Sequence, residues 1–155
     1  RRQPIRFVLA LSGHPLETPA LRAEVHQAIL ASCLVSKSVY DERDTRLILV
    51  WSCKNEKRAV TVDRSLLARL GSKITPAEAP VLEALQVQLQ AEEVSFDIAW
   101  NTLLQDCAKL AFGQPVVVRV EQGGLEAWPC WSAQKSWPTD PPIVLFVQWI
   151  GELPL

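Results

Sequence analysis

Five short apolar runs constrain the fold of this chain more than any other feature of its sequence. They are Ile5–Ser12, Leu47–Trp51, Arg58–Asp63, Pro115–Glu121 and Ile143–Ile150. Each is as long as a β-strand, and none approaches the ~20 residues that a membrane-spanning helix needs. The first and last runs are apolar on both faces, which is typical of strands in the interior of a sheet.

The links between the runs predict how the strands pair. The short turn Lys54-Asn55-Glu56-Lys57 lies between the second run and the third, so those two strands are expected to be antiparallel. Helical patterns separate the first run from the second and the third from the fourth, and long helical crossovers require some parallel pairing. We therefore predict an α/β fold: one mixed sheet of five to six strands, with three main helices packed mostly on one face. Leu125–Ser132 is a candidate for the sixth strand, at an edge.

Capping residues indicate where the helices begin. Thr18-Pro19 opens a helix that is predicted to reach about Ser36. Thr75 with Glu78 has the spacing of a capping box and predicts a second start. Ser95 opens a third helix with the clearest amphipathic stripe in the chain.

Length and composition predict one globular domain over residues 1–155. The chain is 48% hydrophobic and 21% charged, as in ordinary globular proteins. It begins Arg1-Arg2 and contains no methionine, so we expect a fragment of a longer protein. Cys33 and Cys107 fall on apolar helix stripes and are predicted to be buried thiols. The sequence does not determine the cellular compartment, although it slightly favours the cytoplasm.

The stretch from Glu121 to Pro142 concentrates unusual chemistry. Trp128, Trp131 and Trp137 lie there among proline and polar residues rather than on a periodic face. Exposed tryptophans form binding platforms at protein interfaces, so these three are candidates for a contact surface. In the alternative, their indoles cover an open side of the sheet.

Two other segments are candidate binding sites. Ser12, His14 and Thr18 lie between the first strand and a helix N-terminus, where ligands often bind. Lys54, Lys57 and Arg58 are predicted at a hairpin, where basic side chains contact a partner or protect a sheet edge.

Catalytic groups are few. His14 with Cys53 or Cys130 is a conceivable nucleophilic pair, but no catalytic motif supports it, and no metal or cofactor is predicted. The leading hypothesis is a non-catalytic protein-interaction or adaptor domain, a scaffold or complex subunit that binds another protein or another domain of the same chain. The alternative is a small hydrolase or transferase with a Cys/His or acidic site at strand ends. A third hypothesis is nucleic-acid binding through the basic N-terminal half.

Overall fold

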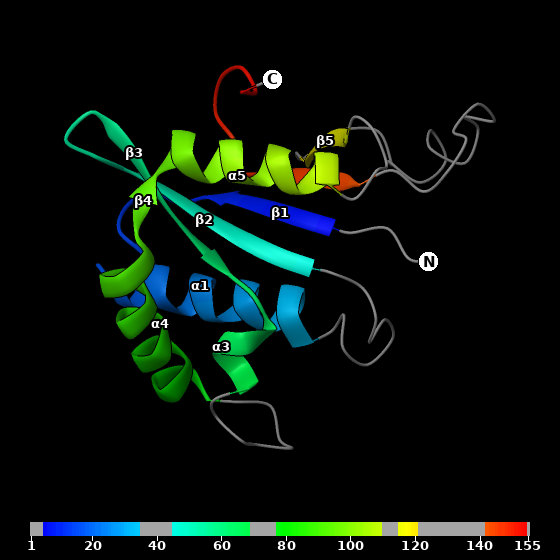
Figure 1. The fold of residues 1–155 in the computed structure, drawn as a ribbon. Coiled ribbons are helices and arrows are strands. Elements are labelled where there is room, and N and C mark those ends of the chain that lie inside the picture. Colours follow the sequence, from blue (N-terminus) through cyan, green and yellow to red (C-terminus); the bar gives the residue numbers. More distant parts are fainter. Residues whose placement is uncertain (1–4, 35–44, 69–76, 110–114, 121–141, 155) are drawn as a thin grey trace.

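Six strands form one mixed sheet with helices on both sides (Figure 1). The computed structural model describes residues 5–34, 45–68, 77–109, 115–120 and 142–154. The strands are β1 (Ile5–Ala10), β2 (Thr45–Cys53), β3 (Glu56–Val62), β4 (Val94–Ser95), β5 (Val116–Val120) and β6 (Ile143–Val147). The helices are α1 (Pro19–Ile29), the π-helix η1 (Leu30–Leu34), α3 (Arg64–Ala68), α4 (Glu78–Glu92) and α5 (Phe96–Lys109).

The strand order is β4-β3-β2-β1-β6-β5. β1 runs parallel to both of its neighbours, β2 and β6, and β5 runs parallel to β6. β3 is antiparallel to β2 and to β4. The predicted α/β class with a mixed sheet is therefore confirmed, as is the interior position of the last strand.

The hairpin between β2 and β3 is antiparallel, as predicted, with a shorter turn than the sequence suggested. Cys53 pairs with Glu56, so the turn consists of Lys54 and Asn55 alone. Their φ angles are 51° and 65°, the left-handed values that a two-residue hairpin of type I′ requires.

Each face of the sheet has its own core. We call the first the aliphatic face, because Leu and Val side chains of β1, β2 and β3 pack there against α1, α3 and α4. We call the second the aromatic face, because Phe96, Trp100, Phe146 and Trp149 gather there beneath α5. The expectation that helices pack mostly on one face holds for α1, α3 and α4, whereas α5 covers the other (Figure 1). In the sequence, α5 follows β4 at one edge of the sheet and precedes β5 at the other edge. The chain therefore passes from one edge of the sheet to the other by way of α5.

Two of the three predicted helix caps are confirmed. Thr18 Oγ1 accepts a hydrogen bond from the Leu21 amide at 3.1 Å, and Ser95 Oγ accepts one from the Ile98 amide at 3.4 Å. The predicted capping box is wrong, because α4 begins at Glu78 after Ala77, with no side-chain cap. Pro80 explains the later start: it now lies in the first turn, where its missing N–H has no intrahelical partner to lose.

Several predicted features lie outside the described residues. These are the tryptophans Trp128, Trp131 and Trp137, the thiol Cys130 and the candidate strand Leu125–Ser132. No helix in the described part of the chain has the length and apolar character to cross a membrane.

Candidate functional site

The carboxyl ends of four parallel strands, β1, β2, β5 and β6, lie at the same end of the sheet. After β1 the chain turns toward α1 on the aliphatic face. After the neighbouring strand β6 it turns to the aromatic face, where Trp149 is buried. In α/β sheets, ligands bind where the connections of adjacent strands diverge in this way.

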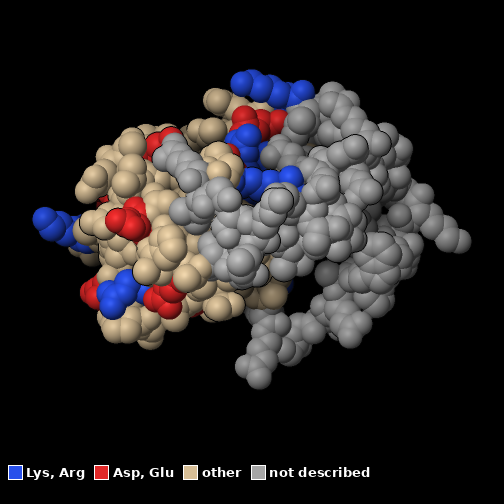
Figure 2. All heavy atoms as spheres, turned by 90° about the horizontal axis from the view of Figure 1, so that it is seen from below, with Lys and Arg blue, Asp and Glu red and all other residues tan. Residues whose placement is uncertain are grey.

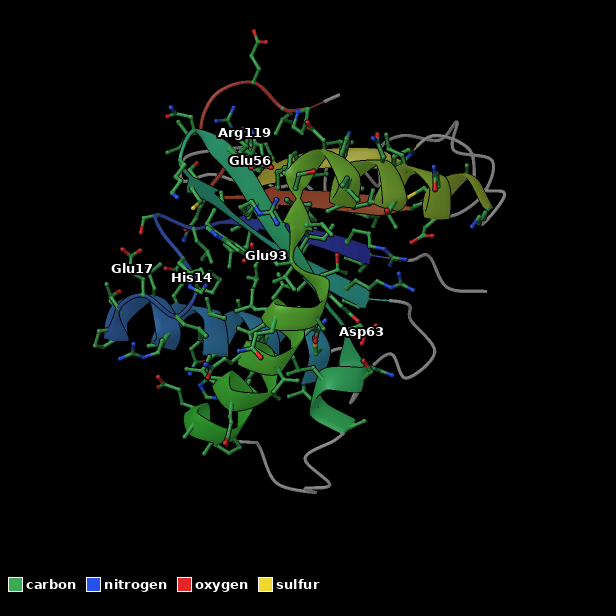
Figure 3. The ribbon with its side chains drawn as sticks, turned by 60° about the vertical axis from the view of Figure 1, so that its left-hand side comes forward. His14, Glu17, Glu56, Asp63, Glu93 and Arg119 are labelled. Carbon is green, nitrogen blue, oxygen red and sulfur yellow. The ribbon has the colours of Figure 1, made fainter. Side chains whose placement is uncertain are left out.

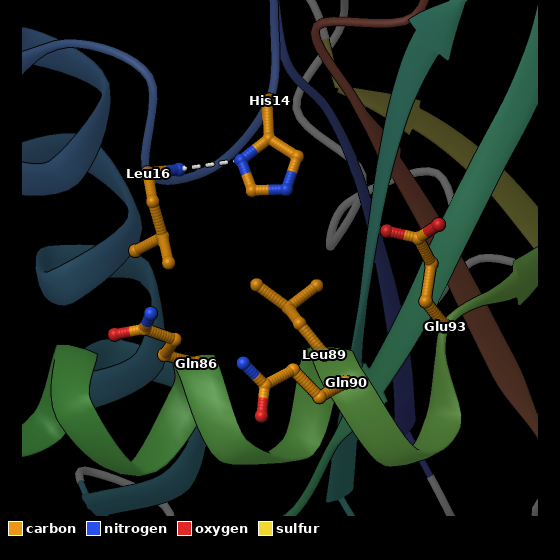
Figure 4. A pocket seen from close by; sticks show the side chains of 6 residues that line it. All are labelled: His14, Leu16, Gln86, Leu89, Gln90 and Glu93. Atoms are coloured by element: carbon orange, nitrogen blue, oxygen red, sulfur yellow. Dashed lines mark hydrogen bonds between the residues drawn. The ribbon is translucent and has the colours of Figure 1, made fainter.

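A cleft of about 490 Å³ opens at this end of the sheet, on the aliphatic face (Figure 4). The loop after β1 and the C-terminal half of α4 line it, through His14, Leu16, Gln86, Leu89, Gln90 and Glu93. Gln86, Leu89 and Gln90 are spaced i, i+3 and i+4, which places them on one side of α4, and Glu93 follows the last residue of the helix. One loop, the C-terminal part of one helix and the residue after it thus build the whole described lining.

Hydrogen bonds within the loop after β1 hold His14 in place. The imidazole Nδ1 accepts from the Leu16 amide at 3.2 Å, and the Glu17 carboxylate accepts from the His14 amide at 3.2 Å. The His14 carbonyl accepts from the Glu17 amide at 3.0 Å. Arg22 donates to the Leu16 carbonyl at 3.0 Å, tying the loop to α1. A methyl group at Gly13 would collide with the Glu17 carboxylate, so the small residue there permits this arrangement.

The orientation of His14 decides what it offers to a ligand. Its ring also lies edge-on to Trp51, with 5.4 Å between the centroids and an interplanar angle of 72°. Because Nδ1 is the acceptor for Leu16, the neutral ring carries its proton on Nε2. Nε2 lies on the side of the ring that faces Leu89 and Glu93 (Figure 4). His14 therefore presents a hydrogen-bond donor to the cleft.

Glu93 is held on the opposite side of the cleft. Its Oε2 accepts from Arg58 Nε at 3.1 Å, and its carbonyl accepts from the same guanidinium at 3.5 Å. Arg58 also donates to Glu56 at 3.2 Å. The hydrogen bond to Glu93, and then that to Glu56, raises the pKa of Arg58, so the cation persists. Among the described residues nothing donates to Glu93 Oε1, and this oxygen is left as an acceptor.

Of the three loop residues predicted to bind a ligand, only His14 lines the cleft. Ser12 is exposed at the end of β1. Thr18 uses its hydroxyl to cap α1. The loop was thus located by its place after a strand, while the role of each side chain depends on the contacts around it.

The three basic residues predicted at the hairpin have different surroundings. Lys54 lies at the exposed hairpin turn, Lys57 Nζ stands 4.6 Å from the Trp149 ring centroid, and Arg58 turns to two carboxylates. Arg64 follows β3, next to Asp63, and Figure 3 shows Asp63 on the other side of Glu93 from His14. On the face seen in Figure 2, basic and acidic side chains of the described residues are interspersed.

The cysteines separate into buried and exposed thiols. Cys33 and Cys107 are buried, as predicted, and burial raises the pKa of the Cys33 thiol. Cys53 is exposed at the end of β2, and within the described residues no hydrogen bond joins it to His14. The same residues contain no group of three His, Cys, Asp or Glu side chains placed to hold a metal.

The α4 side of the cleft was not predicted from sequence. Gln86, Gln90 and Glu93 read as the water-facing stripe of an amphipathic helix, and Leu89 reads as core. A polar stripe has the same pattern whether it faces solvent or a cleft. What reveals the site is the loop after β1, which lies against this stripe (Figure 4).

The sequence matches no protein-family model, and neither curated proteins nor solved structures give a match to the chain. What the cleft binds must therefore be inferred from its own geometry.

Proposed function

We propose that the protein is a non-catalytic interaction domain that holds a short segment of a partner, either another protein or another domain of the same chain, in the His14 cleft. The observation that carries this proposal is the cleft itself. Its volume of about 490 Å³ falls within the ~300–1,000 Å³ of typical ligand sites. Its lining combines apolar contact from Leu16 and Leu89 with the side-chain amides of Gln86 and Gln90.

The rigidity of the cleft favours binding of a flexible segment. His14 is fixed by its loop hydrogen bonds and by Trp51, and Glu93 is fixed by Arg58. A site that is already ordered loses little conformational entropy on binding, so more of the contact energy is available for affinity. The tryptophan-rich stretch, the other predicted contact surface, follows the end of β5 at Val120 in the sequence and lies outside the described residues.

The test begins with selection of peptides by display against the protein. Dissociation constants of the selected peptides are then measured for the protein and for a Gln86→Ala/Gln90→Ala variant. We expect the variant to bind about tenfold more weakly, because each lost hydrogen bond contributes about 0.5–1.5 kcal/mol. Gln105→Ala is the matched control, since Gln105 is an exposed glutamine on α5, across the sheet. Unchanged affinity in the double variant, or no enriched peptide, would refute the proposal.

The hydrolase or transferase alternative depends on the same cleft. His14 and Glu93 line it together, and an imidazole opposite a carboxylate is a common acid–base arrangement. The two functions differ in what happens to the ligand. An interaction domain returns a bound peptide with its mass unchanged. Cleavage or group transfer that disappears in His14→Gln would instead establish the enzyme.

A further inference from the structure

We infer that the cleft recognises the main chain of an extended peptide, with His14 and Glu93 together binding one of its peptide groups. This inference rests on the proposed function and specifies the ligand of the same site. In this arrangement the carbonyl of that peptide group accepts from His14 Nε2–H. The N–H of the same peptide group donates to Glu93 Oε1.

His14 is the hydrogen-bond donor of the cleft. Leu16 donates its amide hydrogen to His14 Nδ1 at 3.2 Å, which leaves the ring proton on Nε2. Glu17 and Trp51 hold the residue and its ring in this orientation. In the part of the chain that the structure describes, no group accepts a hydrogen bond from Nε2. The cleft therefore contains a fixed donor that matches a carbonyl oxygen.

Glu93 is the hydrogen-bond acceptor of the cleft. Arg58 binds Oε2 of Glu93 and also pairs with Glu56, so one cation serves two carboxylates and Oε1 of Glu93 is left over. The side chain of Glu93 is 32% exposed and lines the cleft. The site thus offers one fixed acceptor opposite one fixed donor (Figure 4).

The donor of His14 and the acceptor of Glu93 together select the chemical class of the ligand. A phosphate or carboxylate would be repelled by Glu93, and an ammonium group would leave the His14 donor without a partner. A peptide group is neutral and carries one acceptor and one donor, so it satisfies both. Peptide main chain therefore fits the polarity of this pair better than a charged ligand does.

The spacing of side chains along α4 matches that of an extended peptide. Residues four apart on a helix are offset by about 6 Å along its axis. Alternate residues of an extended peptide are about 6.6 Å apart. Gln86 and Gln90 are four apart on α4 and both line the cleft. The two glutamine side chains can therefore meet successive equivalent positions of an extended segment, with their amides supplying both donors and acceptors.

The experiment replaces each peptide bond of a selected peptide, in turn, with an ester. An ester removes one N–H and keeps the shape of the chain. We expect one replacement to weaken binding about tenfold, as loss of one hydrogen bond predicts. In Glu93→Ala the same replacement should cost nothing, because its acceptor is gone. Glu83→Ala, which removes an exposed carboxylate elsewhere on α4, should keep the full tenfold penalty.

A second measurement does not depend on the Glu93 variant folding. Nitrogen NMR of the imidazole should show the proton of neutral His14 on Nε2, and peptide binding should shift that signal. A neutral ring protonated on Nδ1 would overturn the inference, as would a peptide that binds with no ester penalty at any position. In that second case the proposed interaction function survives. Failure of every peptide to bind would overturn both.

Discussion

The two faces of the sheet reach the same degree of burial by different means. On the aliphatic face, Val25, Ile29, Val60, Val81 and Leu85 are all fully buried between the sheet and three helices. On the aromatic face, a few large rings lie against one another, with centroids 5.1–6.2 Å apart. Burial free energy scales with apolar area, so large rings supply a greater share of it on the second face, although aliphatic side chains such as Val8 and Ile48 are buried there too. A single substitution should therefore be felt more strongly on the aromatic face.

Trp149 explains how the aromatic face is closed with one helix. Its ring contacts Phe96 of α5 at 5.3 Å and Phe146 of β6 at 5.1 Å between centroids. Lys57 of β3 lies over the same ring at 4.6 Å. Gln148, with a φ of 55°, turns the chain just before it. The segment after β6 thus does for the aromatic face what additional helices do for the aliphatic face.

The largest effect is expected from truncating Phe146, which is fully buried. Phe146→Ala should lower the free energy of unfolding by about 3–5 kcal/mol. Leu85→Ala, fully buried on the aliphatic face, should cost less. Phe146 also loses ring contacts with Trp100 and Trp149, worth about 0.5–1.5 kcal/mol each. Urea denaturation of both variants gives the comparison. An equal or larger cost for Leu85→Ala would show that the concentration in few rings has no energetic consequence.

Trp149→Ala should have the next largest effect, about 3 kcal/mol, because the indole is large and 6% exposed. The loss should be local to the aromatic face. Cys107 reports on that face and Cys33 on the other, since each is buried in its core. Thiol-labelling rates, measured under native conditions in variants that keep one of these cysteines, should rise at Cys107 more than at Cys33. An equal rise at both would mean that the whole sheet opens together.

The smallest effect should come from Lys57→Ala, at about 0.5–1 kcal/mol, the range of a cation–π contact at a partly exposed site. The same substitution in a Trp149→Ala background should cost close to nothing. Thermal unfolding of the single and double variants measures this coupling. If the cost of Lys57→Ala does not depend on Trp149, the lysine contributes only to the strand and not to closure of the aromatic face.

Local patterns predicted most of the architecture. The apolar runs located five of the strands, because a buried strand must be apolar along its length. The short link between β2 and β3 required antiparallel pairing. Ser95 marked the start of α5, and the stripe from Phe96 to Cys107 marked its buried face. Each of these signals depends on neighbours within one or two turns of chain, which the sequence alone displays.

Long-range packing decided the rest. Whether α5 covered the same face as α4 or the opposite one depended on the route of a crossover between the two sheet edges, which no local pattern encodes. The cleft arose in the same way. His14 and Glu93 come from opposite halves of the chain, and the stripe on α4 looks like an ordinary solvated surface until the loop after β1 lies against it. The sequence by itself thus determined the elements and their buried sides. Only the tertiary structure decided which polar side chains meet, because that depends on how those elements are arranged in space.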